Sequence, residues 1–140
     1  MFGTIVLAVD GSEHAERAVE LARKLAAVSG DQVVITHVTE YMVGRGTGTL
    51  ELDDDQSGIE QARQYAKELA DAGIAAHLEL ARVQAGTGHI AKALLETADK
   101  HDAGVILMGS RGRTDLASLL LGSVAHKVLH LSDRPVLIAR

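Results

Sequence analysis

Apolar residues along the chain form two kinds of pattern, short continuous runs and longer segments with helical spacing. Ile5–Val9 is a continuous apolar run, which is typical of a strand buried on both faces of a parallel sheet. Beyond Asp10-Gly11-Ser12, apolar residues recur every three or four positions up to Gly30, and Ser12 is a suitable N-cap for the predicted helix. Further strands are predicted at Gln32–Val38, Ala75–Val83, Val105–Met108 and Val136–Ala139. Further helices are predicted over Ile59–Ala72, Ile90–Lys100 and Ser123–Leu131.

This order of elements predicts an α/β fold, a three-layer sandwich in which four helices cover both faces of a five-stranded parallel sheet, in a Rossmann-like arrangement. The first and fourth strands are the most uniformly apolar and belong in the centre, which favours the strand order 3-2-1-4-5. Ala75–Val83 alternates between apolar and polar residues, as an edge strand does. In this order the connections leave the first and fourth strands toward opposite faces, so a ligand site is predicted at their carboxyl ends.

The segment Thr39–Gln56 has neither a helical nor a strand period and predicts a long loop. It contains Gly44, Gly46 and Gly48, followed by the acidic triplet Asp53-Asp54-Asp55. A solvated loop and a lid or partner-binding segment are both open interpretations. The acidic triplet lacks the spacing of a calcium loop and is expected to be solvated.

Composition limits the classes of function. The chain has 140 residues, 46% apolar and 24% charged, which predicts one globular domain over residues 1–140. Its net charge of −5 argues against a general nucleic-acid surface. It has no cysteine, and no apolar stretch approaches the roughly 18 residues of a membrane span, so we expect a soluble cytoplasmic protein without membrane insertion.

A glycine-rich stretch after the fourth predicted strand is the strongest candidate for chemistry. Gly109-Ser110-Arg111-Gly112 ends that strand, and Gly122-Ser123 begins the last predicted helix. Glycines let backbone N–H groups converge on an anion, and a helix N-terminus adds unpaired donors and partial positive charge. From residue 111 to 140, five Lys/Arg against two Asp give a local charge of +3. Together these features predict a phosphate site.

Asp10 ends the first strand and should face that stretch across the predicted site. Its carboxylate could accept hydrogen bonds from ribose hydroxyls or hold Mg²⁺ beside a phosphate. Arg113 and Thr114 add a further charge and a hydroxyl on the opposite side.

Other motifs have simpler interpretations. Gly86-Thr87-Gly88-His89-Ile90-Ala91 matches a dinucleotide fingerprint, but the acid expected about 20 residues later is absent, which favours an ordinary strand-to-helix turn. His126 and His130 are spaced i, i+4 without a third ligand, and we expect a solvated helix face. The sequence contains no Walker A motif, no Gly-x-Ser-x-Gly elbow and no cysteine nucleophile.

The last predicted strand, Val136–Ala139, is apolar and is placed at a sheet edge. Such an edge promotes aggregation unless it is covered or paired. Pairing with the same strand of a second copy predicts a homodimer.

The sequence resembles the universal stress protein family, in its ATP-binding subgroup. The resemblance covers the whole chain and rests on Gly109-x-x-Gly112, nine residues, then Gly122-Ser123, together with the opening Ile-Val-Leu-Ala-Val-Asp-Gly-Ser, Thr-His-Val at 36–38 and the closing Arg-Pro-Val-Leu-Ile. It implies an adenine nucleotide alpha hydrolase-like fold, a homodimer through the last strand and a role in stress response or regulation.

The same resemblance implies a set of residues that contact ATP. Asp10 would contact the ribose, with Ala8 and Val9 nearby, and the backbone of Val38 would receive the adenine. The ribose and phosphates would be lined by Met108, Gly109, Arg111, Gly112, Gly122, Ser123 and Val124. The family varies at Arg111 and over Thr39–Gln56.

Three functions are consistent with this sequence. The first is a regulatory protein in which ATP occupancy changes a dimer or partner surface. The second is a slow Mg²⁺-dependent ATPase, which ranks lower because no residue is an evident base for water. The third is a protein-interaction module in which the glycines are purely structural.

Overall fold

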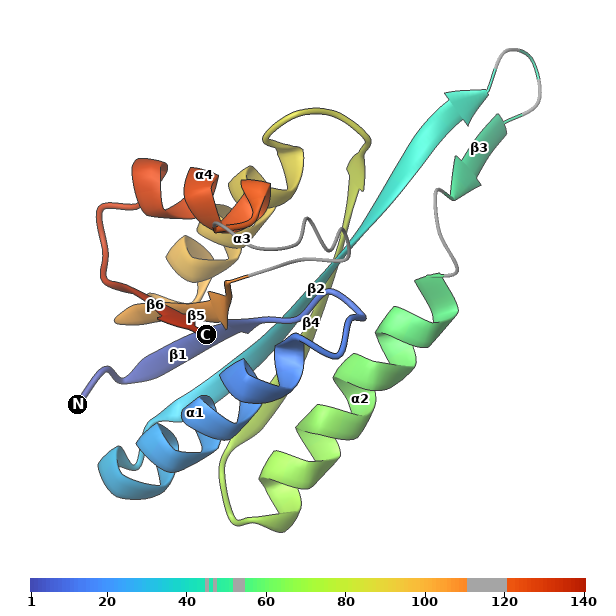
Figure 1. Cartoon of the computed structure of the whole chain (residues 1–140). Helices are drawn as coiled ribbons and strands as arrows, with labels where there is room; N and C mark the ends of the chain where they lie inside the picture. Colours follow the sequence, from blue (N-terminus) through green and yellow to red (C-terminus); the bar gives the residue numbers. More distant parts are fainter. Residues whose placement is uncertain (45, 47, 52–54, 111–120) are drawn as a thin grey trace.

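A computed structural model of the chain describes residues 1–44, 46, 48–51, 55–110 and 121–140. Strands and helices alternate along most of the chain (Figure 1). The strands are β1 (Thr4–Ala8), β2 (Gln32–Gly44), β3 (Gly48–Glu51), β4 (Ala76–Gln84), β5 (Val105–Gly109) and β6 (Val136–Ala139). The helices are α1 (Ala15–Ser29), α2 (Asp55–Asp71), α3 (His89–Lys100) and α4 (Ser123–Leu131).

The parallel sheet has the predicted topology. Its strands lie in the order β4-β2-β1-β5-β6, which is the order 3-2-1-4-5 when the parallel strands are counted along the chain. The central strands β1 and β5 are buried along most of their length, as their continuous apolar runs predict. The alternating strand β4 lies at one edge and β6 at the other. The prediction of the fold class is therefore confirmed.

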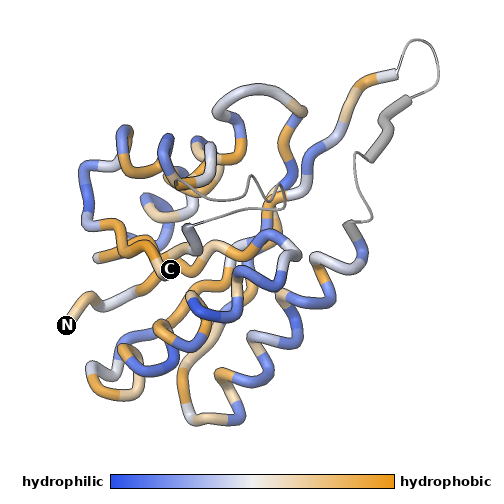
Figure 2. The backbone as a smooth tube through the Cα atoms, viewed as in Figure 1, coloured by the Kyte–Doolittle hydropathy of each residue, from blue (hydrophilic) through white to orange (hydrophobic). Residues whose placement is uncertain are grey.

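Helices cover both faces of this sheet, with α1 and α2 on one side and α3 and α4 on the other (Figure 1). Successive residues of β1 point to opposite faces, so Ile5 and Leu7 belong to the cluster under α1 and α2, whereas Val6 belongs to the cluster under α3 and α4. Figure 2 shows the strands at the centre as hydrophobic and the helices as alternating between hydrophobic and hydrophilic residues. Aliphatic side chains dominate both layers of the core.

The prediction of a loop over Thr39–Gln56 is wrong. β2 continues to Gly44 and pairs with the antiparallel strand β3, so that the two form a hairpin that projects from the body of the molecule (Figure 1). Tyr41 pairs with Gln84 of β4 on one edge and with Glu51 of β3 on the other. The guanidinium of Arg82 lies 4.4 Å from the centre of the Tyr41 ring and supports the base of the hairpin.

The hairpin has a physical cause that periodicity alone does not reveal. Tyr41, Met42 and Val43 have high or moderate strand propensity, and Gly46 has φ of 80°, which suits a tight reversal. Met42 and Val43 are 50% and 62% exposed. Because neither face of this part of β2 is buried, the apolar alternation expected of a strand is missing from the sequence.

Two helix starts also differ from the prediction. Ser12 is not the N-cap of α1, because the chain makes a turn over residues 11–14 and the helix begins at Ala15 after His14. The Ser12 hydroxyl donates to Asp10 instead. α2 begins at Asp55, four residues before the first apolar position of its predicted range. The prediction that the acidic triplet is solvated concerns residues 53–54 and the Asp55 side chain, which lie outside the described part of the structure.

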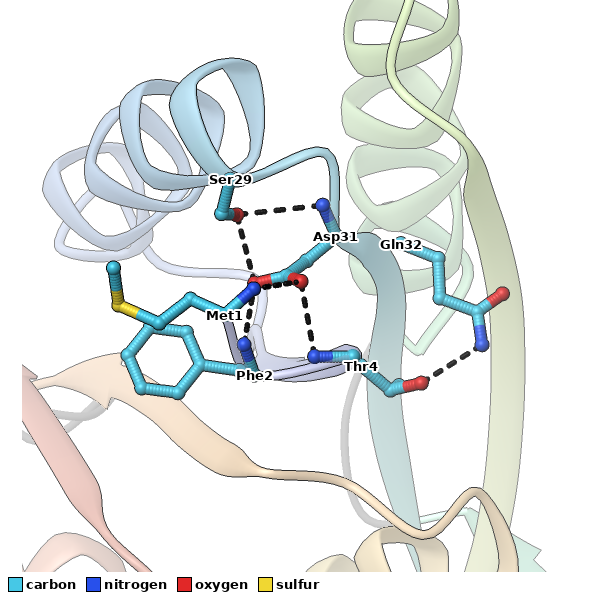
Figure 3. Close-up of polar contacts among 7 residues, drawn as sticks. Met1, Phe2, Thr4, Ser29, Asp31 and Gln32 are labelled. Carbon is cyan, nitrogen blue, oxygen red and sulfur yellow. Dashed lines mark hydrogen bonds and ion pairs between the residues drawn. The ribbon is translucent and has the colours of Figure 1, made fainter.

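One buried carboxylate, that of Asp31, holds the end of the sheet at which β1 and β2 begin (Figure 3). Asp31 accepts hydrogen bonds from the backbone N–H groups of Phe2 and Gly3, each at 2.9 Å, and from the Ser29 hydroxyl at 2.7 Å. The terminal amine of Met1 lies 2.9 Å from the same carboxylate. Burial raises the pKa of Asp31, but these donors outweigh it and hold the pKa well below its usual range. The cluster lies at the opposite end of the sheet from the candidate site.

Candidate functional site

The candidate site lies at the carboxyl ends of β1, β2 and β5. β1 is between the other two strands, and Ala8 at its end pairs with Thr36 of β2 and with Met108 of β5. The β1–α1 connection leaves toward one face of the sheet, whereas the connection from β5 leads to α4 on the other face. The strand ends therefore form the topological switch point at which open parallel sheets bind ligands.

Four of the five apolar residues predicted for the site pack in one core cluster, whereas Val9 belongs to the cluster on the other face of the sheet. Met108 is buried, and Ala8, Val38 and Val124 are partly buried and pack against the cluster that contains it. They come from β1, β2, β5 and α4, and we call the exposed parts of Ala8, Val38 and Val124 the apolar surface of the site. Because three of these side chains keep some exposure, a flat apolar ring could bury more of them.

The β1–α1 loop carries Asp10 beside that surface. The Asp10 carboxylate accepts hydrogen bonds from the Ser12 backbone N–H at 3.0 Å and from the Ser12 hydroxyl at 2.6 Å. Gly11 has φ of 86°, a conformation that a side chain would strain. Val9 is buried, and its N–H donates to the carbonyl of Thr36 at 3.0 Å. The loop is thus a short structured turn that presents one carboxylate at the end of β1.

Helix α2 contacts the same loop. Gln61 accepts from the Gly11 N–H at 3.1 Å with its side-chain oxygen and donates to the Ser12 carbonyl at 3.0 Å with its side-chain nitrogen. Tyr65 lies one turn further along α2 and is buried. Burial raises the pKa of Tyr65, and the negative charges of Glu16, Glu68 and Asp10 raise it further. Asp10 is therefore within electrostatic reach of α2.

The edge of β2 offers main-chain groups to a ligand. Val33 N–H and Tyr41 C=O bond toward β4, each at 2.8 Å, whereas Thr36 C=O accepts from Val9 on the opposite edge. Main-chain groups of successive strand residues point to opposite edges, so both polar groups of Val38 face the β1 side. β1 ends at the level of Thr36, and β3 pairs with this same edge only from Tyr41 onward. Val38 thus presents a donor and an acceptor at the site.

Helix α4 brings its N-terminus to the end of β5. The Gly122 N–H donates to the carbonyl of Ser110 at 2.6 Å, and the Ser110 N–H donates to Ala139 of β6 at 2.9 Å. Gly122 is the N-cap of α4, which is followed by Ser123 and Val124 in its first turn. No side chain caps this end among the described residues. The first N–H groups of α4 and its partial positive charge are therefore directed toward an anion at this end.

Some predicted site residues cannot be placed. Arg111 and Gly112, with Arg113 and Thr114, lie outside the described residues, whereas Gly109 is the last residue of β5. The dinucleotide-like stretch starting at Gly86 lies between the edge strand β4 and α3, as predicted.

The histidine pair on α4 lies as expected on an exposed helix face. The rings of His126 and His130 are stacked with their centres 6.5 Å apart. In the described part of the chain, no three His, Cys, Asp or Glu side chains gather in a way that could hold a metal ion.

Two residues that support the site were not predicted. His37 is buried, and its Nδ1 donates to the carbonyl of Val9 at 3.1 Å, because a carbonyl can only accept. Gln61 holds the other side of the loop from a helix 50 residues away in sequence. His37 stands within the Thr-His-Val motif, which was a usable signal. Gln61 carries no signal in the sequence, because only the packing of α2 brings it to the loop.

Comparison with known proteins identifies the family of this chain. Residues 1–140 match the sequence profile of the Universal stress protein family. The chain belongs to this family. A universal stress protein of Thermus aquaticus, encoded in the 3′ region of a QAH/OAS sulfhydrylase, is 33% identical over 141 residues, and the match covers 100% of both chains.

Solved structures of universal stress proteins share the fold. The protein MJ0577, of Methanocaldococcus jannaschii, superposes with a TM-score of 0.76 at 25% identity, over 99% of this chain and 96% of that one. A universal stress protein in complex with cAMP superposes with a TM-score of 0.65 at 29% identity, over 99% of this chain and 97% of that one. Within the described residues, none of the helices combines the length and the apolar character needed to cross a membrane.

Proposed function

We propose that this universal stress protein binds ATP at the carboxyl ends of β1, β2 and β5 and acts as a regulatory protein of the stress response. The observation that carries the proposal is that Ala8, Val38, Met108 and Val124 pack in one apolar cluster at the switch point, where the Asp10 loop follows β1 and the N-terminus of α4 contacts the end of β5. An adenine ring needs an apolar surface with a few fixed polar groups, and phosphates need convergent donors. The complex of a similar universal stress protein with cAMP supports an adenine nucleotide as ligand.

Each part of the site has a role in this proposal. The adenine packs on the apolar surface and bonds to the main chain of Val38, and Asp10 accepts from the ribose, with Val9 beside it. The phosphates bind at the N-terminus of α4 and at the glycines that follow β5. The residues assigned to the nucleotide are Ala8, Val9, Asp10, Val38, Met108, Gly109, Arg111, Gly112, Gly122, Ser123 and Val124. Mg²⁺, when bound with ATP, would neutralise phosphate charge near Asp10.

The regulatory part of the proposal concerns the output of binding. Nucleotide occupancy changes a dimer or partner surface of the protein in the cytoplasm, and the dimer forms through β6. In the chain by itself, three of the four residues of β6 are only partly buried, which leaves apolar surface at that edge. Light scattering at tens of micromolar, with and without ATP, tests this part. A monomer in both conditions would contradict it.

Gly122→Val tests the phosphate end of the site. Gly122 has φ of −58° and ψ of 160°, which any residue adopts without strain, so the variant should fold. Its branched side chain would stand beside the first N–H groups of α4 and should weaken ATP binding at least tenfold, or about 1.4 kcal/mol. Calorimetric titration with MgATP measures the affinity, and thermal unfolding checks the fold. Gly122→Ala, a smaller step, should give an intermediate loss; equal affinity in all three proteins would refute the phosphate site.

Phosphate release separates the regulatory protein from the two alternatives. A binding protein should turn over no ATP above background. Steady release of phosphate that Asp10→Ala abolishes would instead indicate the slow Mg²⁺-dependent ATPase. Absence of any heat on titration with MgATP would leave the interaction module. Denaturing freshly purified protein and identifying any released nucleotide is an independent check on the ligand.

A further inference from the structure

The side chain of Gln61 makes two hydrogen bonds to the backbone of the Asp10 loop. Its oxygen accepts from the Gly11 N–H and its nitrogen donates to the Ser12 carbonyl, so one amide bridges the first and the third peptide groups after Asp10. Both contacts join the Gln61 side chain to the main chain of residues 49 to 50 positions earlier in the sequence. A terminal amide that satisfies both its donor and its acceptor in this way fixes the loop in position and in orientation.

The loop needs such support because of its own conformation. Gly11 has a positive φ, and glycine loses more conformational entropy on ordering than any other residue. The hydrogen bonds from Ser12 to Asp10 orient the carboxylate relative to Ser12. They do not orient the loop relative to the rest of the protein. Gln61 supplies that link from α2, and His37 supplies the matching link from β2 through the carbonyl of Val9.

We propose that Gln61 is a positioning residue for the nucleotide site, which sets the ribose-binding carboxylate of Asp10 through the backbone of Gly11 and Ser12. This inference rests on the proposed function and deepens it, because it adds a residue that touches no ligand. It also links α2, which follows the hairpin, to the nucleotide site. The loop that carries Asp10 is then held by two separate elements, β2 through His37 and α2 through Gln61.

The test compares two glutamines on the same helix. Gln61→Ala removes both bonds to the loop, whereas Gln64→Ala removes an exposed side chain that donates to Glu68 of the same helix at 3.2 Å. The loss of two backbone hydrogen bonds should raise the dissociation constant for ATP roughly five- to tenfold in Gln61→Ala. Gln64→Ala should bind ATP within about twofold of the unaltered protein. Gln61→Met keeps the volume of the side chain but cannot make both bonds, and its dissociation constant for ATP provides the test if Gln61→Ala does not fold.

A second readout separates positioning from a general loss of structure. We expect the unaltered protein to prefer ATP over at least one of its 2′-deoxy and 3′-deoxy analogues, because Asp10 contacts the ribose. In the Gln61 variants that preference should fall toward one, since a displaced carboxylate no longer distinguishes the hydroxyl. Unchanged affinity, or an equal loss for ATP and both analogues, would overturn the role of Gln61. Failure of the unaltered protein to bind ATP at all would instead overturn the proposed function.

Discussion

The hydroxyl of Thr36 is the clearest place at which one substitution should stabilise this protein. Thr36 is fully buried in β2, and its Oγ1 has no hydrogen-bond partner among the described residues. It lies on the same face of the strand as Val34 and Val38, which belong to or pack against the apolar cluster under α3 and α4. Thr36→Val replaces the hydroxyl by a methyl group of similar size and keeps the β-branched shape that suits a strand.

The size of the effect follows from the burial. A buried hydroxyl without a partner costs about 1–3 kcal/mol in proteins, and the new methyl group adds a small gain from apolar burial. Allowing for imperfect packing of the methyl group, we expect the free energy of unfolding to rise by about 1–2 kcal/mol. For a chain of 140 residues this is an increase in Tm of roughly 3–6 °C.

Thermal and urea unfolding followed by circular dichroism measure this change, and Thr97→Val is the matched control. Thr97 is also buried, but its hydroxyl donates to the carbonyl of Ala93 at 2.9 Å. Removing that bond should leave stability unchanged or lower it by up to about 1.5 kcal/mol. If Thr36→Val lowers the Tm as well, the Thr36 hydroxyl makes a hydrogen bond in solution and the reasoning is wrong.

Two further predictions concern the fold. Asp31→Asn should lower the free energy of unfolding by roughly 2–3 kcal/mol at pH 7, because one oxygen that accepts from Phe2, Gly3 or Ser29 becomes a donor. The folded pKa of Asp31 is depressed, so its contribution to the free energy of unfolding is complete above the unfolded pKa of about 3.9 and is lost as pH falls through the folded value. Urea unfolding at pH 7 and below pH 4 should therefore show that the stability difference between the unaltered protein and Asp31→Asn shrinks at low pH. A constant difference would contradict this assignment. Gly104→Ala should destabilise by about 1–3 kcal/mol, because its Cβ would overlap the backbone carbonyl of Phe2. Gly86→Ala should destabilise less, because the atoms nearest its Cβ belong to the His89 side chain, which bonds to the Gln84 carbonyl but can shift more easily than backbone. Equal Tm values for these two glycine variants would refute the steric account.

The sequence predicted the parallel sheet because its strands are short, separate and apolar enough to be recognised one at a time. The continuous runs of β1 and β5 indicated central strands, and the alternation in β4 indicated an edge. The hairpin was missed because its residues lack such an apolar pattern. Tyr41, Met42 and Val43 are in a strand that is not buried on either face, so burial left no pattern there. Local spacing also misplaced the start of α1, since Ser12 bonds to Asp10 rather than capping the helix.

For the candidate site too, some features follow from the sequence and others only from the tertiary structure. By itself, the sequence determined which residue types stand at the strand ends and at the start of α4, because glycines, caps and strand boundaries are local features. Only the tertiary structure brought Ala8, Val38, Met108 and Val124 into one cluster, since each comes from a different element. It also decided that Gln61 supports the Asp10 loop, because that contact depends on how α2 packs against the sheet and on no neighbour in the chain.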